Sequence, residues 1–152
     1  MATWPSSRPF SSPRWNPFSP PPPPVGWPTP PVTPIRADRI KDDLLIYLIE
    51  RKRAGRTVAA YGAAAKGNTL LNYAGVKPDL LPYVCDAAPA KQGKYLPGSH
   101  IPIRPPVALR DDPPDQVLIL PWNIADEAKA QLADLAERGT LFMTAVPQMR
   151  TI

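Results

Sequence analysis

The crowding of proline at the N-terminus limits where this chain can fold. The chain has 152 residues and 24 prolines, and 13 of these prolines lie among the first 35 residues. Proline lacks the backbone N–H that helix and sheet interiors need, and this segment shows neither a helical nor an alternating apolar pattern. We therefore expect residues 1–35 to be a disordered, extended tail and residues 36–152 to form one small globular domain.

The composition of the tail also fits two other interpretations. A proline-rich segment can be the ligand of a proline-recognition domain. Serine, arginine, tryptophan and proline without pattern are also what a GC-rich message yields when it is read in the wrong frame. In that case residues 1–35 would not be native coding sequence, and the sequence leaves all three interpretations open.

Charge and cysteine content exclude several classes of protein. Residues 36–152 carry 16 basic and 13 acidic side chains, a net charge of +3, which is too little for the basic stripe of a nucleic-acid binder. The single cysteine, Cys85, rules out an internal disulfide and a cysteine-based zinc site. No stretch approaches the ~20 apolar residues that span a membrane, and the N-terminus lacks the apolar core of a signal peptide. We expect a cytoplasmic protein without a metal site and without nucleic-acid or membrane partners.

Short apolar runs alternate with helical patterns after the tail. Asp38 and Asn123 are expected to cap the first and the last helix, and Gly55 and Gly139 to end them. The expected order is a helix over 38–55, a strand over 57–61, a helix over 66–73, a strand over 81–85, a long loop, an edge segment over 101–103, a helical turn over 107–109, a strand over 116–120, a helix over 123–139 and a strand over 140–146. This alternation predicts an α/β fold: a small Rossmann-like domain with a parallel sheet of about four strands flanked by helices.

The turn after the first strand is a candidate anion site. Gly62 and Ala63 open it, and Lys66, Gly67 and Asn68 stand where the next helix begins. The start of a helix leaves N–H groups unpaired and carries the positive end of the helix dipole, which suits a phosphate. A tight strand-to-helix connection without a ligand explains the same pattern, and the spacing alone does not decide between them.

Two known phosphate motifs do not fit this turn. Residues 62–69 lack the lysine that follows the second glycine of a Walker A loop, because Lys66 comes one position too early. The dinucleotide fingerprint fails as well, since Ala64 takes the place of its second glycine. Asp86 nevertheless ends the second strand 24 residues after Gly62, near the offset of a ribose-binding carboxylate. A simple strand-end turn residue is the alternative for Asp86.

Further candidates stand at the ends of the other strands. Lys91 and Lys94 follow Asp86 on a long loop, where they would neutralise a diphosphate or simply face solvent. Trp122 and Asn123 follow the strand over 116–120, and would either contact a base or sugar, or plug the sheet end and cap a helix. If that strand and the second strand flank the first, the chain has a topological switch point, and these ends line one crevice. No acid pair or Ser–His–Asp set emerges, so the residues indicate a phosphate- or nucleotide-binding module.

Three segments together resemble the C-terminal domain of S-adenosylmethionine-dependent C-methyltransferases that act on nucleotide-linked deoxysugars. These segments are YGAAAKGNTLLN at 61–72, DAAPAKQGKYLPGSHIPI at 86–103 and ILPWN at 119–123. The family often has proline where Ala64 stands, a small departure. The resemblance implies that Lys66, Gly67 and Asn68 lie by the phosphates of a nucleotide diphosphate sugar, typically dTDP-linked.

The same resemblance implies an enzyme of three parts, of which this chain holds one. The zinc-binding part, the S-adenosylmethionine-binding part and the general base are expected upstream. In the implied reaction a base removes a proton next to a keto group of the sugar, and the resulting carbanion takes the methyl group. We therefore expect the chain to bind no S-adenosylmethionine and to need a separate methyltransferase domain or subunit. A stand-alone nucleotide-sugar-binding module and a small NAD(P)-binding Rossmann protein are the alternatives.

Overall fold

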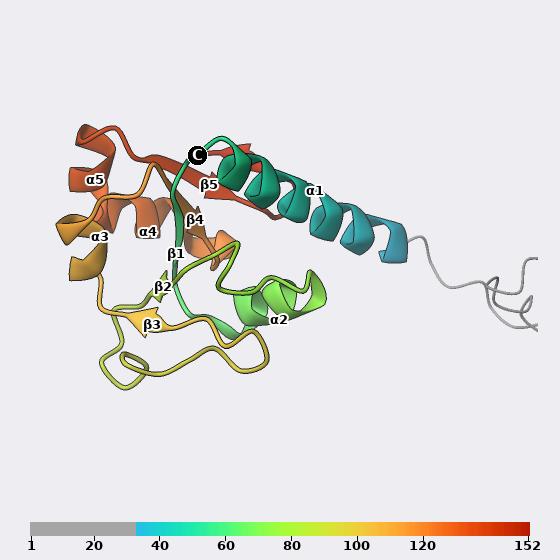
Figure 1. Ribbon diagram of the computed structural model, residues 1–152, viewed down its shortest axis with the longest axis horizontal. Coiled ribbons are helices and arrows are strands. Elements are labelled where there is room, and N and C mark those ends of the chain that lie inside the picture. The colour runs from blue at the N-terminus through green and yellow to red at the C-terminus, as the bar shows by residue number, and fades with distance from the viewer. Residues whose placement is uncertain (1–32) are drawn as a thin grey trace, which may run out of the picture. The chain divides into compact units, whose positions relative to one another are not determined.

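A six-stranded sheet between two layers of helices forms the body of this protein (Figure 1). The computed structural model describes residues 33–152, so the tail expected over residues 1–35 lies outside it, apart from the last three residues. The helices are α1 (Thr33–Arg53), α2 (Ala65–Tyr73), α3 (Val107–Asp111), α4 (Ala125–Gln131) and α5 (Ala133–Glu137), with a 3₁₀ turn, η1, over Trp122–Ile124. The strands are β1 (Val58–Tyr61), β2 (Val84–Cys85), β3 (Ile103–Arg104), β4 (Gln116–Ile119), β5 (Leu141–Thr144) and β6 (Arg150–Thr151).

The strand order confirms the predicted α/β fold and its switch point. The sheet runs β3-β2-β1-β4-β5-β6, with β1 to β5 parallel and β6 antiparallel to β5. Because β1 lies between β2 and β4, the chain crosses from one half of the sheet to the other after β3. In open parallel sheets, ligands bind where two such halves diverge, at the carboxyl ends of the strands.

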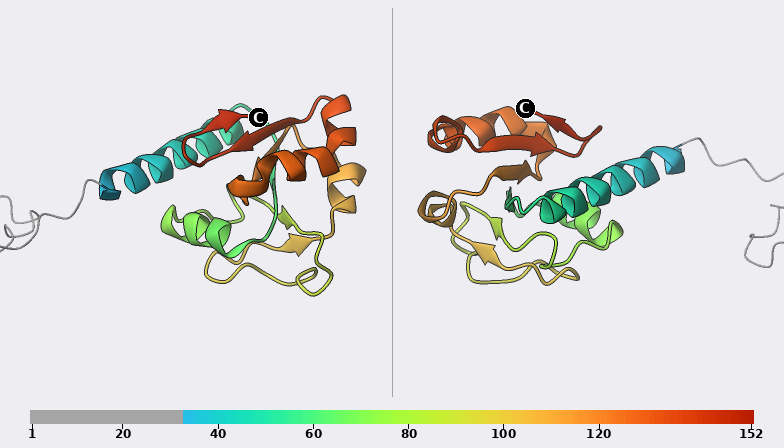
Figure 2. Two further views of the ribbon diagram at one scale, coloured as in Figure 1. Left: turned by 180° about the vertical axis from the view of Figure 1, so that it is seen from behind. Right: turned by 45° about the horizontal axis from the view of Figure 1, so that its top comes forward.

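Successive side chains of a strand point to opposite faces of the sheet, and a separate core lies on each face. Val58 and Ala60 of β1 point to one core, whereas Ala59 and Tyr61 point to the other. The first core is covered by Leu44 and Leu48 of α1 and Leu71 of α2. The second core is covered by Leu109 of α3, Ala125 and Ala128 of α4 and Leu135 of α5. The helices thus lie on both faces, as the two views of Figure 2 show.

Both predicted helix caps are wrong. The first helix begins at Thr33, five residues before Asp38, so Asp38 lies inside it. Pro34 is compatible with the first turn, where an N–H would have no helical partner anyway. Asn123 makes no capping hydrogen bond, since it lies inside η1 rather than at the start of α4. The predicted last helix is divided at Leu132, which is buried and leaves helical geometry with φ of −115° and ψ of 22°.

The sheet also has more strands than the four predicted, and it is mixed rather than purely parallel. The predicted strand over 81–85 shortens to Val84–Cys85, after Pro82, which cannot donate to a ladder. The predicted edge segment over 101–103 is displaced to Ile103–Arg104. The antiparallel strand Arg150–Thr151 escaped prediction because both of its residues are exposed and carry no apolar alternation.

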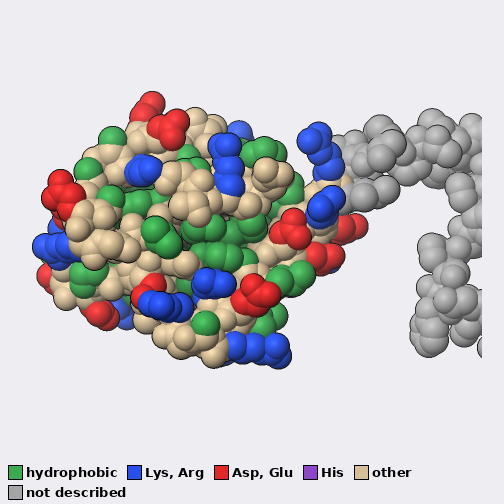
Figure 3. Space-filling model, turned by 90° about the horizontal axis from the view of Figure 1, so that it is seen from above, with side chains coloured by type: hydrophobic (Ala, Val, Ile, Leu, Met, Phe, Trp, Pro, Cys, Tyr) green, Lys and Arg blue, Asp and Glu red, His purple; other side chains and the backbone are tan. Residues whose placement is uncertain are grey.

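The surface of the described residues carries its charges in mixed order. On the face shown in Figure 3, lysine and arginine side chains lie among acidic and apolar ones and form no continuous basic stripe. Between residues 33 and 152, no helix is long and apolar enough to cross a membrane. No group of three or more His, Cys, Asp or Glu side chains in that same range could hold a metal ion.

Cys85 is expected to be an inert thiol in the folded protein. It is fully buried in β2, and its Sγ donates a weak hydrogen bond to the carbonyl oxygen of Pro105 at 3.3 Å. Burial disfavours the thiolate and raises the pKa of Cys85 to about 11, so the thiol is protonated at pH 8. We expect a thiol-specific reagent such as DTNB to react at least ~100-fold faster at pH 8 after unfolding in urea than in the native state. Equal rates in both states would contradict this burial.

Candidate functional site

The glycine turn is packed directly against the end of β4. Gly62 has a φ of +88°, and a Cβ built on it would lie 2.5 Å from Cδ of Pro121. A Cβ on Gly67 would likewise lie 2.6 Å from Cβ of Leu120. Both glycines are therefore required by the close approach of this turn and α2 to β4, independently of any ligand.

The start of α2 leaves donors free, as the sequence predicts. The first hydrogen bond of the helix runs from the N–H of Asn68 to the oxygen of Ala64 at 2.9 Å, and no side chain caps the helix. The N–H groups of Ala65, Lys66 and Gly67 accordingly have no acceptor among residues 33–152. Three adjacent donors at the positive end of a helix dipole form a favourable environment for an anion.

Asp86 holds the glycine turn from the neighbouring strand end. Its Oδ2 accepts hydrogen bonds from the N–H of Ala63 at 2.7 Å and from Nζ of Lys91 at 3.1 Å, and its Oδ1 accepts from the N–H of Ala88 at 2.8 Å. Lys91 also donates to the backbone oxygen of Ala63 at 3.0 Å. The carboxylate is buried and already has three donors, so both of its oxygens serve the protein's own structure.

The long loop after Asp86 is fastened to its surroundings by hydrogen bonds. Gly93 donates to the oxygen of Ile103 at 2.9 Å, and Ile103 donates to that of Lys94 at 2.7 Å. From α2, Asn72 Nδ2 donates to the oxygen of Pro97 at 2.8 Å. Because the loop is held at both of these points, the wall that it forms beside α2 is present before any ligand binds.

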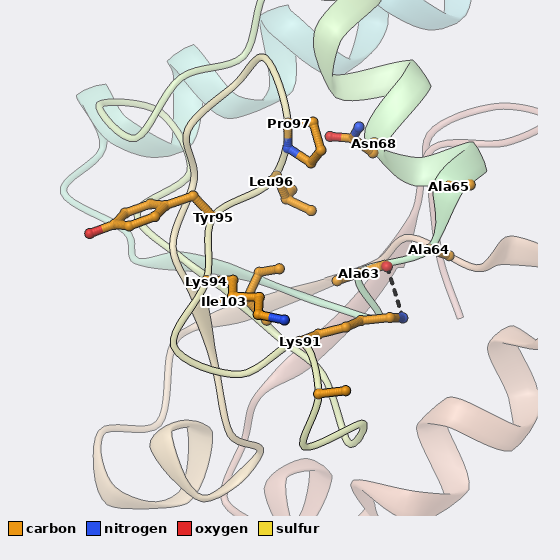
Figure 4. A pocket seen from close by; sticks show the side chains of 11 residues that line it. Ala63, Ala64, Ala65, Asn68, Lys91, Lys94, Tyr95, Leu96, Pro97 and Ile103 are labelled. Carbon is orange, nitrogen blue, oxygen red and sulfur yellow. Dashed lines mark hydrogen bonds between the residues drawn. The ribbon is translucent and has the colours of Figure 1, made fainter.

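A cavity of about 480 Å³ lies between this loop and the start of α2 (Figure 4). It is lined by Ala63, Ala64, Ala65, Asn68, Ala90, Lys91, Lys94, Tyr95, Leu96, Pro97 and Ile103. The Asn68 Oδ1 atom is buried and has no hydrogen-bond partner among the described residues. The volume lies within the range of ligand-binding pockets, and the mixture of apolar walls with a few polar groups is typical of them.

A second, smaller cavity of about 230 Å³ lies beside the first at the switch point. It is lined by Tyr61, Gly62, Ala64, Asp86, Ala87, Lys91, Pro121, Ile124, Ala128 and Gln131. Ala64 and Lys91 line both cavities, so the glycine turn and the Lys91 side chain stand between them.

The structure gathers some of the predicted site residues and leaves others outside the cavities. Ala63, Asn68 and Lys91 line the larger cavity, and Gly62 and Asp86 line the smaller one. The remaining four predicted residues, Lys66, Gly67, Trp122 and Asn123, line neither.

Sequence reasoning missed most of the loop wall, above all Tyr95, Leu96 and Pro97. Only the unusual length of the loop signalled that it has a role. The sequence gives no sign of the hydrogen bonds that fold the loop back toward α2.

Comparisons with known proteins place the chain in one family. The sequence model described as "C-methyltransferase C-terminal domain" matches residues 35–147. The C-methyltransferase NovU of Streptomyces niveus is 40% identical over 98 residues, which make up 64% of this chain and 23% of NovU. The chain therefore spans less than a quarter of the length of this relative.

One solved structure is similar at a greater distance. It is the UDP-D-quinovosamine 4-dehydrogenase of Vibrio fischeri, with a TM-score of 0.48 and 18% sequence identity. The superposition covers 64% of this chain and 93% of that chain. This likeness is too remote to bear on ligand or activity.

Proposed function

The chain belongs to the family of C-methyltransferase C-terminal domains, and from this premise we propose that it binds a nucleotide diphosphate sugar for a sugar C-methyltransferase. A dTDP-linked keto-deoxysugar is the ligand we propose. The chain corresponds to less than a quarter of the C-methyltransferase to which it is similar. The methyl transfer itself is therefore assigned to a separate methyltransferase domain or subunit, and the chain alone is proposed to be inactive.

The observation that carries this proposal is the larger cavity at the start of α2. Its volume of about 480 Å³ suits a small organic ligand, and its walls include the apolar side chains of Leu96, Pro97 and Ile103. Ala64 and Ala65 line it at the beginning of the helix, where the N–H groups of residues 65–67 are free. An anionic group joined to a partly apolar body, as in a nucleotide sugar, matches this combination.

Asp86 argues against an adenosine-containing cofactor at this edge of the sheet. In dinucleotide-binding Rossmann domains a carboxylate at this place accepts the hydroxyls of the ribose. Here the carboxylate is occupied by Ala63, Ala88 and Lys91, and it is only 8% exposed. The carboxylate is thus not free for the hydroxyls of a ribose, which supports the proposal that an adenosine-containing cofactor is bound by another part of the enzyme.

The residues of this chain bind and position the ligand in this proposal. S-adenosylmethionine supplies the methyl group in the complete enzyme. The glycine turn, held in place by Asp86 and Lys91, presents the free N–H groups of α2 to the diphosphate. Asn68, one turn into the same region of α2, lines the cavity and is proposed to contact the ligand. Lys66, Trp122 and Asn123 stay predicted contacts, and a cytoplasmic location stays a prediction as well.

Binding of dTDP to the 152-residue chain is the direct test. We expect saturating dTDP to raise the melting temperature, because a ligand at 100 times its Kd adds about 2.7 kcal/mol to the stability of the native state. NAD and S-adenosylmethionine at the same concentration are expected to leave it unchanged. Differential scanning fluorimetry measures all three, with UDP added to compare the bases.

Three results would contradict the proposal. Stabilisation by NAD but not by dTDP would favour a small NAD(P)-binding protein. Methylation of a dTDP-linked keto-sugar by the chain and S-adenosylmethionine alone would show that it needs no partner. A chain that binds dTDP but never restores activity to a methyltransferase part lacking this domain would instead be a stand-alone binding module.

A further inference from the structure

We infer that the ammonium group of Lys94, rather than that of Lys66 or Lys91, is the cation that meets the diphosphate of the ligand. The inference deepens the proposed function and rests on it. It concerns Lys91 and Lys94, which line the larger cavity, and Lys66 in the first turn of α2. Sequence position alone does not rank them. The three side chains have different surroundings in the structure, and these differences indicate which ammonium is free to meet the diphosphate.

The charge of Lys91 is already used within the protein. Its Nζ lies 3.1 Å from Oδ2 of Asp86 and 3.0 Å from the backbone oxygen of Ala63. Asp86 is buried, so withdrawing this ammonium toward a ligand would leave a buried carboxylate with one donor fewer. Lys91 is therefore a positioning residue: it holds the glycine turn and adds no net positive charge to the cavity.

The side chain of Lys66 does not face the cavity. It is exposed in the first turn of α2, and it is not among the residues that line either cavity. The backbone N–H of Lys66 remains available at the helix start. The contribution of this residue to anion binding is consequently expected to come from its main chain, which a side-chain substitution leaves in place.

Lys94 enters the cavity from the opposite wall. Its backbone oxygen accepts a hydrogen bond from Ile103 at 2.7 Å, which anchors the base of the side chain to β3. Its side chain is among those that line the cavity, across from Ala64 and Ala65 at the start of α2 (Figure 4). Between residues 33 and 152 no carboxylate or carbonyl oxygen pairs with the Lys94 ammonium, whereas that of Lys91 has two such partners, so the charge of Lys94 is available to a ligand.

The other groups of the cavity define what accompanies the diphosphate. Leu96, Pro97 and Ile103 form apolar walls, and Asn68 Oδ1 is a buried acceptor without a partner. A cation, a row of free amide donors and apolar walls together fit a nucleoside diphosphate better than free phosphate.

Substitution of each lysine in the 152-residue chain tests the assignment, with dTDP as the ligand. We expect Lys94→Gln to weaken dTDP binding about tenfold. This is the lower end of the range for a hydrogen bond between charged groups, because Lys94 is exposed and solvent screens its charge. Lys66→Gln is expected to change the Kd less than threefold, and Lys94→Arg to keep most of the affinity. Lys129→Gln, on α4 at the other face of the sheet, is the matched control for loss of one positive charge. Isothermal titration calorimetry at two salt concentrations measures the Kd.

Thymidine lacks the phosphates, so its affinity measures how the nucleoside fits the cavity without the charge contact proposed for Lys94. Its affinity is expected to be the same for Lys94→Gln and the unmodified chain. A tenfold loss for Lys66→Gln with none for Lys94→Gln would overturn the inference while the proposed function stands. An equal loss of thymidine affinity in Lys94→Gln would also overturn it, since the lysine would then shape the cavity. No dTDP binding by the unmodified chain would defeat the proposed function and this inference together.

Discussion

Replacing Gly62 by alanine is expected to lower the free energy of unfolding by about 2–5 kcal/mol, from two separable effects. The backbone of Gly62 has a φ of +88°, a conformation that costs an L-residue about 1–2 kcal/mol. The new methyl group would also meet Cδ of Pro121 at 2.5 Å, and overpacking of this kind typically costs a further ~1–3 kcal/mol. Urea denaturation followed by circular dichroism measures the loss.

Gly139 provides a matched control for this substitution. Its φ of +93° is close to that of Gly62, but a Cβ built on it meets nothing within 4 Å. Gly139→Ala should therefore show the backbone cost alone, about 1–2 kcal/mol. A double-mutant cycle of Gly62→Ala with Pro121→Ala isolates the contact, because removing the proline ring removes the obstacle. If Gly62→Ala and Gly139→Ala lowered the free energy of unfolding equally, the turn would accommodate the methyl group beside Pro121 without a packing cost.

The comparison of Gly62 with Gly139 bears on how glycine-rich turns are interpreted. A glycine beside a predicted phosphate site is easily taken as the place where the ligand needs access to the backbone. In this protein Gly62 and Gly67 are both explained by contact with the end of β4, through Pro121 and Leu120. The features that indicate a ligand are instead the free N–H groups of α2 and the cavity beside them.

The sequence predicted the parts of the fold that follow from local patterns. The apolar runs of β1 and β4 and the glycine after α2 mark their elements within a few residues, since burial and turn chemistry act over short stretches. The two-residue strand β6 carries no such pattern. The division of the last helix at Leu132 has neither glycine nor proline to announce it. These features depend on packing between distant segments.

The candidate site shows the same division between local and distant causes. The helix start at residues 65–67 and the position of Asp86 at a strand end were predicted, because each follows from its own segment. The partners of Asp86 were not predicted, since its bond to Ala63 joins residues 23 positions apart. Lys94 acquires its place opposite α2 only through the pairing of its loop with Ile103. Sequence spacing therefore located the site but did not assign the roles within it.

Asp86→Ala is expected to destabilise the free protein by about 2–4 kcal/mol, because the substitution leaves three donors without their acceptor. Two of them are the backbone N–H groups of Ala63 and Ala88, and the third is the ammonium of Lys91. Lys91 is partly exposed, so its share of the loss is small and the buried N–H of Ala63 accounts for most of it. Chemical denaturation without any ligand measures this effect.

Two further variants distinguish this structural role from the ribose contact that the sequence suggested. Lys91→Met removes the ammonium but keeps the carboxylate and its two backbone donors, so we expect a loss of no more than about 1 kcal/mol. Asp111→Ala, an exposed carboxylate at the end of α3, should leave stability within about 0.5 kcal/mol. If Asp86 instead served a ligand, Asp86→Ala would lower the affinity for dTDP and leave the unfolding of the free chain unchanged. The contacts of its two oxygens predict instead that Asp86→Ala lowers the stability of the free chain. The affinity for dTDP would then fall as a consequence, because the glycine turn is no longer held against β2.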